Sequence, residues 1–286
     1  MNYFDLHCDT LSRCVQKNEV VEKNTGCVDV ERLSAFDKCY QVYAAFIRDD
    51  ISPADALTSF NRQYSLYKFS DFKNTGHILS VENASLLDYS LYRLCYLREC
   101  GVQILTLTWN GENCLGGGAD TNIGLSDFGK TVIKECERLG IIVDLSHLSD
   151  KSFYDAMSII SKPPIASHSN CRAVCNHRRN LTNEQLQNIF AAGGIVGLNL
   201  HCDFVGDKLF PGNILKHIEH LLTLGGENSI ALGTDFDGCS PIKDVENIEK
   251  MPKFYEILCE NLGISLANKI FYENAKIFFD KRSFLL

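Results

Sequence analysis

Short runs of apolar, mostly β-branched residues recur along the whole chain, and segments with helical periodicity separate them. The runs predict eight strands, at residues 3–7, 40–46, 77–81, 104–108, 141–146, 164–168, 195–200 and 230–234. The segments between them space apolar residues three and four apart, as in "FGKTVIKECERLG" (128–140), and several end at a glycine. Strands that alternate with helices in this way are typical of a parallel sheet.

Eight such units in 286 residues predict an α/β fold, a closed (β/α)8 barrel of the TIM type. We expect a single domain over residues 1–286 that finishes with C-terminal helices, linked near Gly263. An open doubly wound sheet is the alternative. Its usual G-x-G-x-x-G motif after the first strand is absent, as is a G-x-x-x-x-G-K-[ST] phosphate loop, so the pattern favours the barrel.

Composition excludes several classes of function. The net charge is −8 and no dense block of Lys and Arg occurs, which argues against a nucleic-acid partner. No apolar run approaches the ~18 residues of a membrane span, so no membrane partner is expected. The 13 cysteines are scattered without a C-x-x-C pair, and no export signal precedes the first strand. These features predict reduced thiols in a cytoplasmic protein.

Side chains that bind metals gather where the predicted strands end. In a barrel these ends converge on one mouth, which is where barrel enzymes keep their chemistry. One histidine at a strand end is more often an ordinary polar residue than a ligand, but six ligand-type side chains at five strand ends favour a shared site. They are His7, Asp9, Glu82, His147, His168 and Asp235.

Spacing and charge indicate metal ions. His7 and Asp9 are two residues apart, so on a strand both side chains point the same way. Three clustered carboxylates repel one another, and two divalent cations would neutralise them. Imidazole and carboxylate ligands suit zinc, with manganese, iron and cobalt as alternatives. Two ions would lower the pKa of a bound water from ~15.7 toward ~7, and a free carboxylate would then move its proton.

Five segments carry a family resemblance: "DLHCDT", "VEN", "VDLSHLS", "IASHSNCRAVCNHRRN" and "LGTDFDG", in this order between residues 5 and 238. They resemble the membrane (renal) dipeptidase family of zinc peptidases, in the metal-dependent amidohydrolase superfamily. The resemblance implies a (β/α)8 barrel that holds two zinc ions and hydrolyses dipeptides. It also implies tolerance of a D-residue at the C-terminal position and, since relatives often dimerise, a homodimer.

The resemblance assigns the metal ligands by position. His7 and Asp9 would bind the first zinc ion, Glu82 would bridge both ions, and His147 and His168 would bind the second.

The resemblance also assigns the remaining roles. Asp235 would be the catalytic acid/base that handles the nucleophile's proton and the leaving amine. Arg179 would bind the substrate's terminal carboxylate, a task that suits a planar guanidinium, whereas the neighbouring Arg178 fits less well by position. Asp237 would either support the site or cap the following turn.

Two positions depart from the family pattern and bear on substrate binding. Trp109 stands where mammalian members have a histidine, and an indole can donate a hydrogen bond but carries no charge. His201 stands in "NLH", where the family often has "N-F-Y". We expect both residues to influence which small dipeptide is accepted.

Two other functions stay open. The same site could serve another amidohydrolase reaction, on N-acyl amino acids or lactones. The chain could also be a metal-binding relative without catalytic activity.

Overall fold

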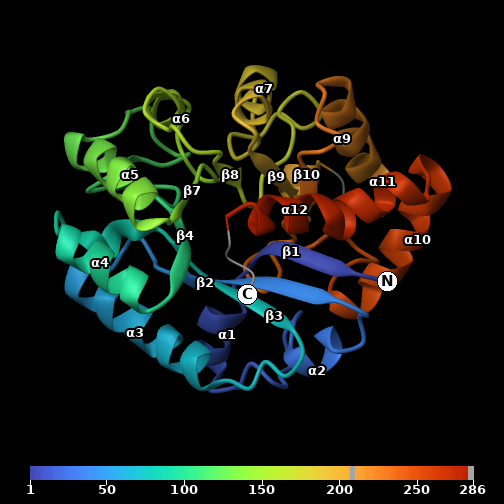
Figure 1. Ribbon diagram of the computed structural model, residues 1–286, viewed down its shortest axis with the longest axis horizontal. Coiled ribbons are helices and arrows are strands. Elements are labelled where there is room, and N and C mark those ends of the chain that lie inside the picture. Colours follow the sequence, from blue (N-terminus) through green and yellow to red (C-terminus); the bar gives the residue numbers. More distant parts are fainter. Residues whose placement is uncertain (207–209, 283–286) are drawn as a thin grey trace.

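The computed structural model describes residues 1–206 and 210–282, in which parallel strands close into a ring (Figure 1). The ring order is β1-β10-β9-β8-β7-β4-β3-β2. The predicted (β/α)8 barrel is therefore confirmed, and the open sheet is excluded because β1 pairs with both β2 and β10. The barrel strands are β1 (Tyr3–Cys8), β2 (Cys39–Phe46), β3 (Gly76–Glu82), β4 (Val102–Thr106), β7 (Ile142–Asp144), β8 (Ile165–Ala166), β9 (Ile195–Leu198) and β10 (Ile230–Leu232).

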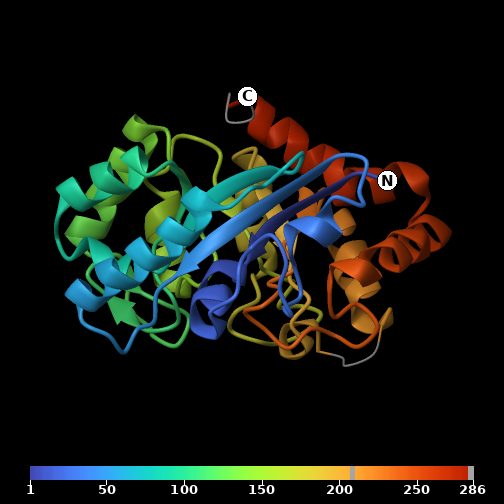
Figure 2. The same ribbon diagram turned by 90° about the horizontal axis from the view of Figure 1, so that it is seen from below.

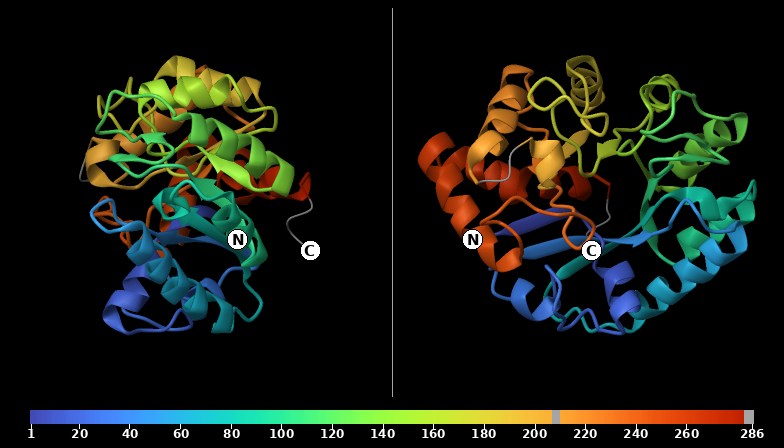
Figure 3. Two further views of the ribbon diagram at one scale, coloured as in Figure 1. Left: turned by 90° about the vertical axis from the view of Figure 1, so that its left-hand side faces the viewer. Right: turned by 180° about the vertical axis from the view of Figure 1, so that it is seen from behind.

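Helices lie around the ring of strands (Figure 3). Those that follow strands β1 to β7 are α1 (Thr10–Lys17), α2 (Val30–Leu33), α3 (Pro53–Phe69), η1 (Ala84–Leu87), α4 (Leu91–Glu99), α5 (Asp127–Leu139) and α6 (Asp150–Met157). The later ones are α7 (Asn183–Ala191), α8 (Cys202–Val205), α9 (Gly212–Thr223), η2 (Ile248–Lys250), α10 (Met251–Leu262), α11 (Ile264–Asn268), η3 (Lys269–Glu273) and α12 (Asn274–Asp280).

Helix starts follow local sequence signals. Ser149 accepts a hydrogen bond from the Ser152 backbone N–H at the start of α6, and Thr182 forms a full capping box with Gln185 at the start of α7. The helical segment between β3 and β4 is divided into η1 and α4. Asp88 and Tyr89 lie between them with φ values of 45° and 58°, which end a right-handed helix.

Strands of the second half of the barrel are shorter than their apolar runs predict. β7 ends at Asp144 and β10 at Leu232, and the residues that follow turn into loops at the mouth. His147 and Asp235 have φ values of 68° and 62°, so neither residue can continue a strand. Between β4 and α5, β5 (Glu112–Asn113) and β6 (Gly116–Gly117) pair as a short antiparallel hairpin.

Two apolar clusters fill the fold. The larger lies between the strands and the surrounding helices. The smaller fills one end of the barrel with residues such as Phe4, Ile78 and Ile104, and side chains of η3 and α12 join it. Figure 2 shows α12, in red, on the side where β1 to β3 begin. The C-terminal helices thus close the end of the barrel opposite the mouth.

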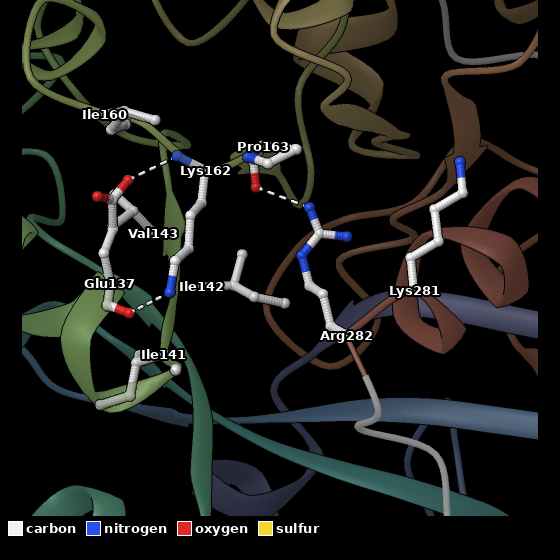
Figure 4. A pocket seen from close by; sticks show the side chains of 10 residues that line it. Glu137, Ile141, Ile142, Val143, Ile160, Lys162, Pro163, Lys281 and Arg282 are labelled. Carbon is white, nitrogen blue, oxygen red and sulfur yellow. Dashed lines mark hydrogen bonds between the residues drawn. The ribbon is translucent and has the colours of Figure 1, made fainter.

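A hydrogen bond attaches the segment that follows α12 to the loop before β8 (Figure 4): the Arg282 guanidinium donates to the Pro163 carbonyl oxygen at 3.0 Å. The same guanidinium donates to the carbonyl oxygen of Phe278, within α12. Nearby, the Lys162 amine donates to the Glu137 carbonyl oxygen. A cavity of ≈290 Å³ lies among these residues, and its lining contains none of the predicted site residues.

Within residues 1–206 and 210–282, no helix combines the length and the apolar character that crossing a bilayer requires.

His217 is a buried histidine that ties α9 to two loops. Its Nδ1 accepts from the Cys171 backbone N–H at 3.1 Å, so its Nε2 carries the proton and donates to the Val205 carbonyl at 3.1 Å. A proton on Nδ1 would break the first of these bonds. Burial lowers the pKa of His217 from 6.5 to about 4.

We predict that His217 makes the protein less stable in acid. Its pKa is lower in the folded state, so below pH 6.5 the unfolded chain binds the proton first, and about 3 kcal/mol is lost by pH 4. Urea unfolding between pH 7 and pH 4 should show a shallower loss for His217→Gln, which cannot titrate. Equal pH slopes for the two proteins would contradict the prediction.

Candidate metal centre

A cavity of ≈1110 Å³ opens at the mouth of the barrel. Most of the predicted site residues line it, namely Asp9, Glu82, Trp109, His147, His201 and Asp235. His7 and His168 are only 1% exposed. His7 contacts Glu82, and His168 contacts His147. The predicted strand ends therefore converge as the barrel requires.

A β-bulge in β1 turns His7 toward the centre. Phe4 and Leu6 both belong to the cluster inside the barrel, so strict alternation would place His7 outside. The pairing with β2 instead shifts between Asp5 and Cys8, where β1 has one extra residue. The buried Asp5 carboxylate holds this bulge, since it accepts from Thr234 N–H at 2.8 Å and from the Thr234 hydroxyl at 2.7 Å.

Glu82 lies at the middle of the cluster. Its Oε2 is 3.2 Å from His7 Nε2, and that nitrogen is 3.3 Å from Asp9 Oδ2. Its Oε1 is 2.8 Å from His147 Nε2 and 3.8 Å from His168 Nε2. The two carboxylate oxygens thus face two different groups of ligand atoms.

The carboxylates of Asp9 and Asp235 both pack against Gly238. A Cβ on Gly238 would come within 2.0 Å of Asp9 Oδ2 and 2.8 Å of Asp235 Oδ1, so any larger residue would displace both carboxylates. Asn199 donates to Asp235 Oδ2 at 2.9 Å and fixes the second carboxylate. His7, Asp9 and Asp235 form one of the groups whose ligand atoms all lie within 4.8 Å of one another.

Two partners set the tautomers of the other histidines. The Ser167 hydroxyl donates to Asp144 Oδ2 at 2.6 Å, so it accepts from His168 Nδ1 at 2.7 Å. Asn110 Oδ1 accepts from His147 Nδ1 at 2.9 Å. Both Nε2 atoms therefore carry lone pairs, and they face each other at 2.8 Å.

This centre is electrostatically unsatisfied without cations. Burial raises the pKa of Glu82 to about 7 and that of Asp235 to about 6. Burial lowers the pKa of His7, but the neighbouring carboxylates, Glu82 first, raise it well above its usual value. Burial also holds the pKa of His147 and His168 well below the usual range. Facing lone pairs, an unpartnered buried Asp9 oxygen and clustered carboxylates form a donor set that fits divalent cations.

Arg179 lies beside the centre rather than in the lining of the cavity. It is 5% exposed and donates to the His168 carbonyl at 3.3 Å, and its guanidinium lies 5.4 Å from the Phe204 ring. Its Nε has no hydrogen-bond partner among the described residues, so the group retains donor capacity. Arg178 is exposed and pairs with Asp120 at 3.2 Å.

Trp109 and His201 lie on different walls of the cavity. The Trp109 ring packs edge-on against Phe46, with centroids 5.2 Å apart, and His201 stacks on Phe204 at 4.4 Å. His201 Nδ1 also accepts from the Asp203 backbone and so caps α8.

Asp237, for which two roles were open, connects loops around the site. It accepts from the Cys27 backbone at 2.6 Å and from the Thr10 hydroxyl at 2.7 Å.

Sequence reasoning did not identify the supporting residues Asn110, Asp144, Ser167 and Asn199. Asp144 and Ser167 precede His147 and His168 in "VDLSH" and "IASH", and this proximity to a ligand was the available signal. Their partners are set by contacts between neighbouring loops and strands, which the linear sequence does not display.

A parallel barrel with histidines and carboxylates at its mouth defines the class of metal-binding barrel proteins that includes many hydrolases. Solved structures agree on the fold. A metallopeptidase dipeptidase matches with a TM-score of 0.91 and 24% identity, over 99% of this chain and 98% of that one. A metallopeptidase from Rhodobacter sphaeroides, liganded with a phosphinate mimic of L-Ala-D-Ala, matches with a TM-score of 0.89 and 22% identity, over 99% of both chains.

Sequence comparison identifies the family. The family model for membrane dipeptidases, peptidase family M19, matches residues 68–278. The chain belongs to this family. An uncharacterized dipeptidase from Schizosaccharomyces pombe is 29% identical, over 85% of this chain but only 65% of that protein's length. An uncharacterized protein from the pqqA 5′ region of Klebsiella pneumoniae is 34% identical, over 63% of this chain and 72% of its own.

Asp144, Ser167 and His168 form a hydrogen-bonded series that orients the His168 ring. If His168 is a metal ligand, Ser167→Ala should weaken the binding of divalent metal, with zinc as the probe, about 10- to 100-fold, because His168 loses the partner that fixes its tautomer. Competition with a chromogenic chelator measures the affinity. Ser80→Ala is the matched control, since that buried hydroxyl donates to the Tyr43 carbonyl instead. Zinc binding by Ser167→Ala at the wild-type affinity would refute this role.

Proposed function

We propose that the protein is a dipeptidase with two divalent metal ions, zinc first among them, and that it tolerates a D-residue at the C-terminal position. The arrangement of Glu82 carries the proposal, because its two oxygens face His7 with Asp9 on one side and the two remaining histidines on the other. One carboxylate with this placement suits a bridge between two ions about 3.5–4 Å apart.

When bound, the ions would supply an activated water and would polarise the scissile carbonyl. Asp235 is suited to hold and pass on the proton. Its carboxyl borders the cavity and is fixed by Asn199, and its raised pKa of about 6 is close to neutral. It would accept a proton as the nucleophile attacks and return it to the departing amine.

Arg179 would bind the terminal carboxylate of the substrate. Its burial and its unpartnered Nε mean that a carboxylate reaching it would find a desolvated donor. Trp109 and His201 would shape the walls on either side of the peptide. The structural neighbour that holds an L-Ala-D-Ala mimic supports a D-residue as one accepted substrate.

We expect chelator-sensitive hydrolysis of L-Ala-D-Ala or L-Ala-L-Ala, with about two metal ions per chain by elemental analysis. Asp235→Asn should lower kcat about 10²- to 10⁴-fold, because the proton carrier is lost, while both ions stay bound. A parallel screen of N-acyl amino acids and lactones tests other amidohydrolase reactions. Two bound ions without turnover of any dipeptide would overturn the proposal.

Arg179→Lys should raise KM for dipeptides about tenfold or more, with a smaller change in kcat, because an ammonium cannot replace the planar guanidinium. Steady-state kinetics of the variant measure the split. The matched control is Arg178→Lys, which changes the adjacent exposed arginine. Equal effects in the two variants would contradict the assignment of Arg179.

A further inference from the structure

The two ends of the mouth cavity come from opposite sides of the barrel. In the ring order, four positions separate β8 from β2, so these strands are diametrically opposed. Arg179 follows β8, whereas Arg48 and helix α3 follow β2. A peptide whose terminal carboxylate binds Arg179 and whose scissile bond lies over the metal centre therefore directs its first residue toward α3.

Helix α3 forms the wall that this first residue would meet. Gln63 holds the helix to the mouth, since it donates to the Phe46 carbonyl at 2.8 Å and accepts from the Phe46 N–H at 3.1 Å. Phe46 is the last residue of β2, so the ten residues of α3 before Gln63 extend the wall beyond the strand end. Ser59, Arg62 and Gln63 all line the cavity.

The cavity is larger than a small dipeptide requires. Its volume of ≈1110 Å³ slightly exceeds the ~300–1,000 Å³ of pockets that hold drug-sized ligands. The cavity as a whole therefore has room for a long side chain on the first residue, and it extends to Ser59 and Arg62 of α3.

Two arginines lie on this side of the cavity, and one of them is paired. The Asp49 carboxylate has no cationic partner among the described residues and accepts from the Gly111 N–H and the Asn83 amide, both at 2.8 Å. Arg48 Nε donates to Asp50 Oδ1 at 2.7 Å. Arg62, in contrast, forms no hydrogen bond or ion pair with any residue in the described ranges. A guanidinium without a partner at the wall of a substrate cavity is suited to a carboxylate of the substrate.

We propose that Arg62 selects dipeptides whose first residue has an acidic side chain, with glutamate as the preferred residue. The inference rests on the proposed dipeptidase function and names a substrate class for it. Arg179 would bind the terminal carboxylate and Arg62 the side-chain carboxylate, on opposite sides of the metal centre. Glutamate is favoured over aspartate because the side chain must reach the α3 wall.

The test compares kcat/KM for L-Glu-L-Ala and for its neutral isostere L-Gln-L-Ala. The metal-loaded wild type should prefer the glutamate substrate about five- to tenfold at low salt, and the preference should shrink as salt screens the exposed guanidinium. Arg62→Gln should bring the ratio to about one, whereas Arg62→Lys should retain part of it. Arg138→Gln, which changes an exposed arginine of α5, is the matched control and should leave the ratio unchanged.

A ratio near one in the wild type, or a ratio that Arg62→Gln leaves unchanged, would overturn the assignment of Arg62. Hydrolysis of L-Ala-L-Ala in the same assay separates this failure from that of the proposed function. If L-Ala-L-Ala is cleaved and glutamate gives no advantage, the dipeptidase proposal stands without Arg62. If the metal-loaded wild type cleaves none of the three dipeptides, both proposals fall.

Discussion

The mouth of the barrel brings together buried groups that repel one another electrostatically. Two imidazole nitrogens, each with a lone pair, face each other at 2.8 Å, and buried carboxylates surround them. Such a group of donors is costly in a low dielectric unless protons or cations neutralise it. Several local features hold it in place: the bulge at Asp5, the glycine at Gly238 and the left-handed backbone of His147. The bulge and the His147 backbone both interrupt regular structure next to candidate ligands, and non-glycine residues in left-handed backbone such as His147 are common at functional sites.

The polar cluster at the mouth and the apolar core that stabilises the fold lie at opposite ends of the barrel. Aliphatic and aromatic side chains fill the opposite end, where Phe279 of α12 stacks on Phe4 with centroids 5.1 Å apart. Between the two ends lie hydroxyl, amide and carboxylate side chains, such as Thr106 and Asp144, which are hydrogen-bonded to each other at 2.7 Å. The Asp144 carboxylate also accepts from the Ser146 and Ser167 backbone N–H groups and the Ser167 hydroxyl, so hydrogen bonds from neutral donors stabilise this buried group and add rigidity beneath the candidate ligands.

Much of the fold could be predicted from the sequence, because eight apolar runs and their helical separators are local patterns. The meeting of the candidate ligands at one mouth could be predicted because barrel topology places every strand end there, whatever the exact boundaries. The bulge in β1 could not, since Asp5 and Thr234 are 229 residues apart and no periodicity links them. The same reason explains why Asn110, the partner of His147, was not identified, and why Arg179 could be assigned a role but not a depth of burial.

Helix α3 is attached to the barrel in a different way from the residues of the candidate metal centre. The proposed metal ligands follow strands that pair with a neighbour on each side, and buried partners such as Ser167 fix the positions of their side chains. The α3 wall is instead attached at the mouth through Gln63 and Phe46, and its cavity-facing side includes the exposed Arg62. A substitution at an exposed helical position disturbs packing little, whereas one beneath the ligands removes a buried hydrogen bond. Substrate choice on the α3 side can therefore change while the geometry of the metal centre is preserved.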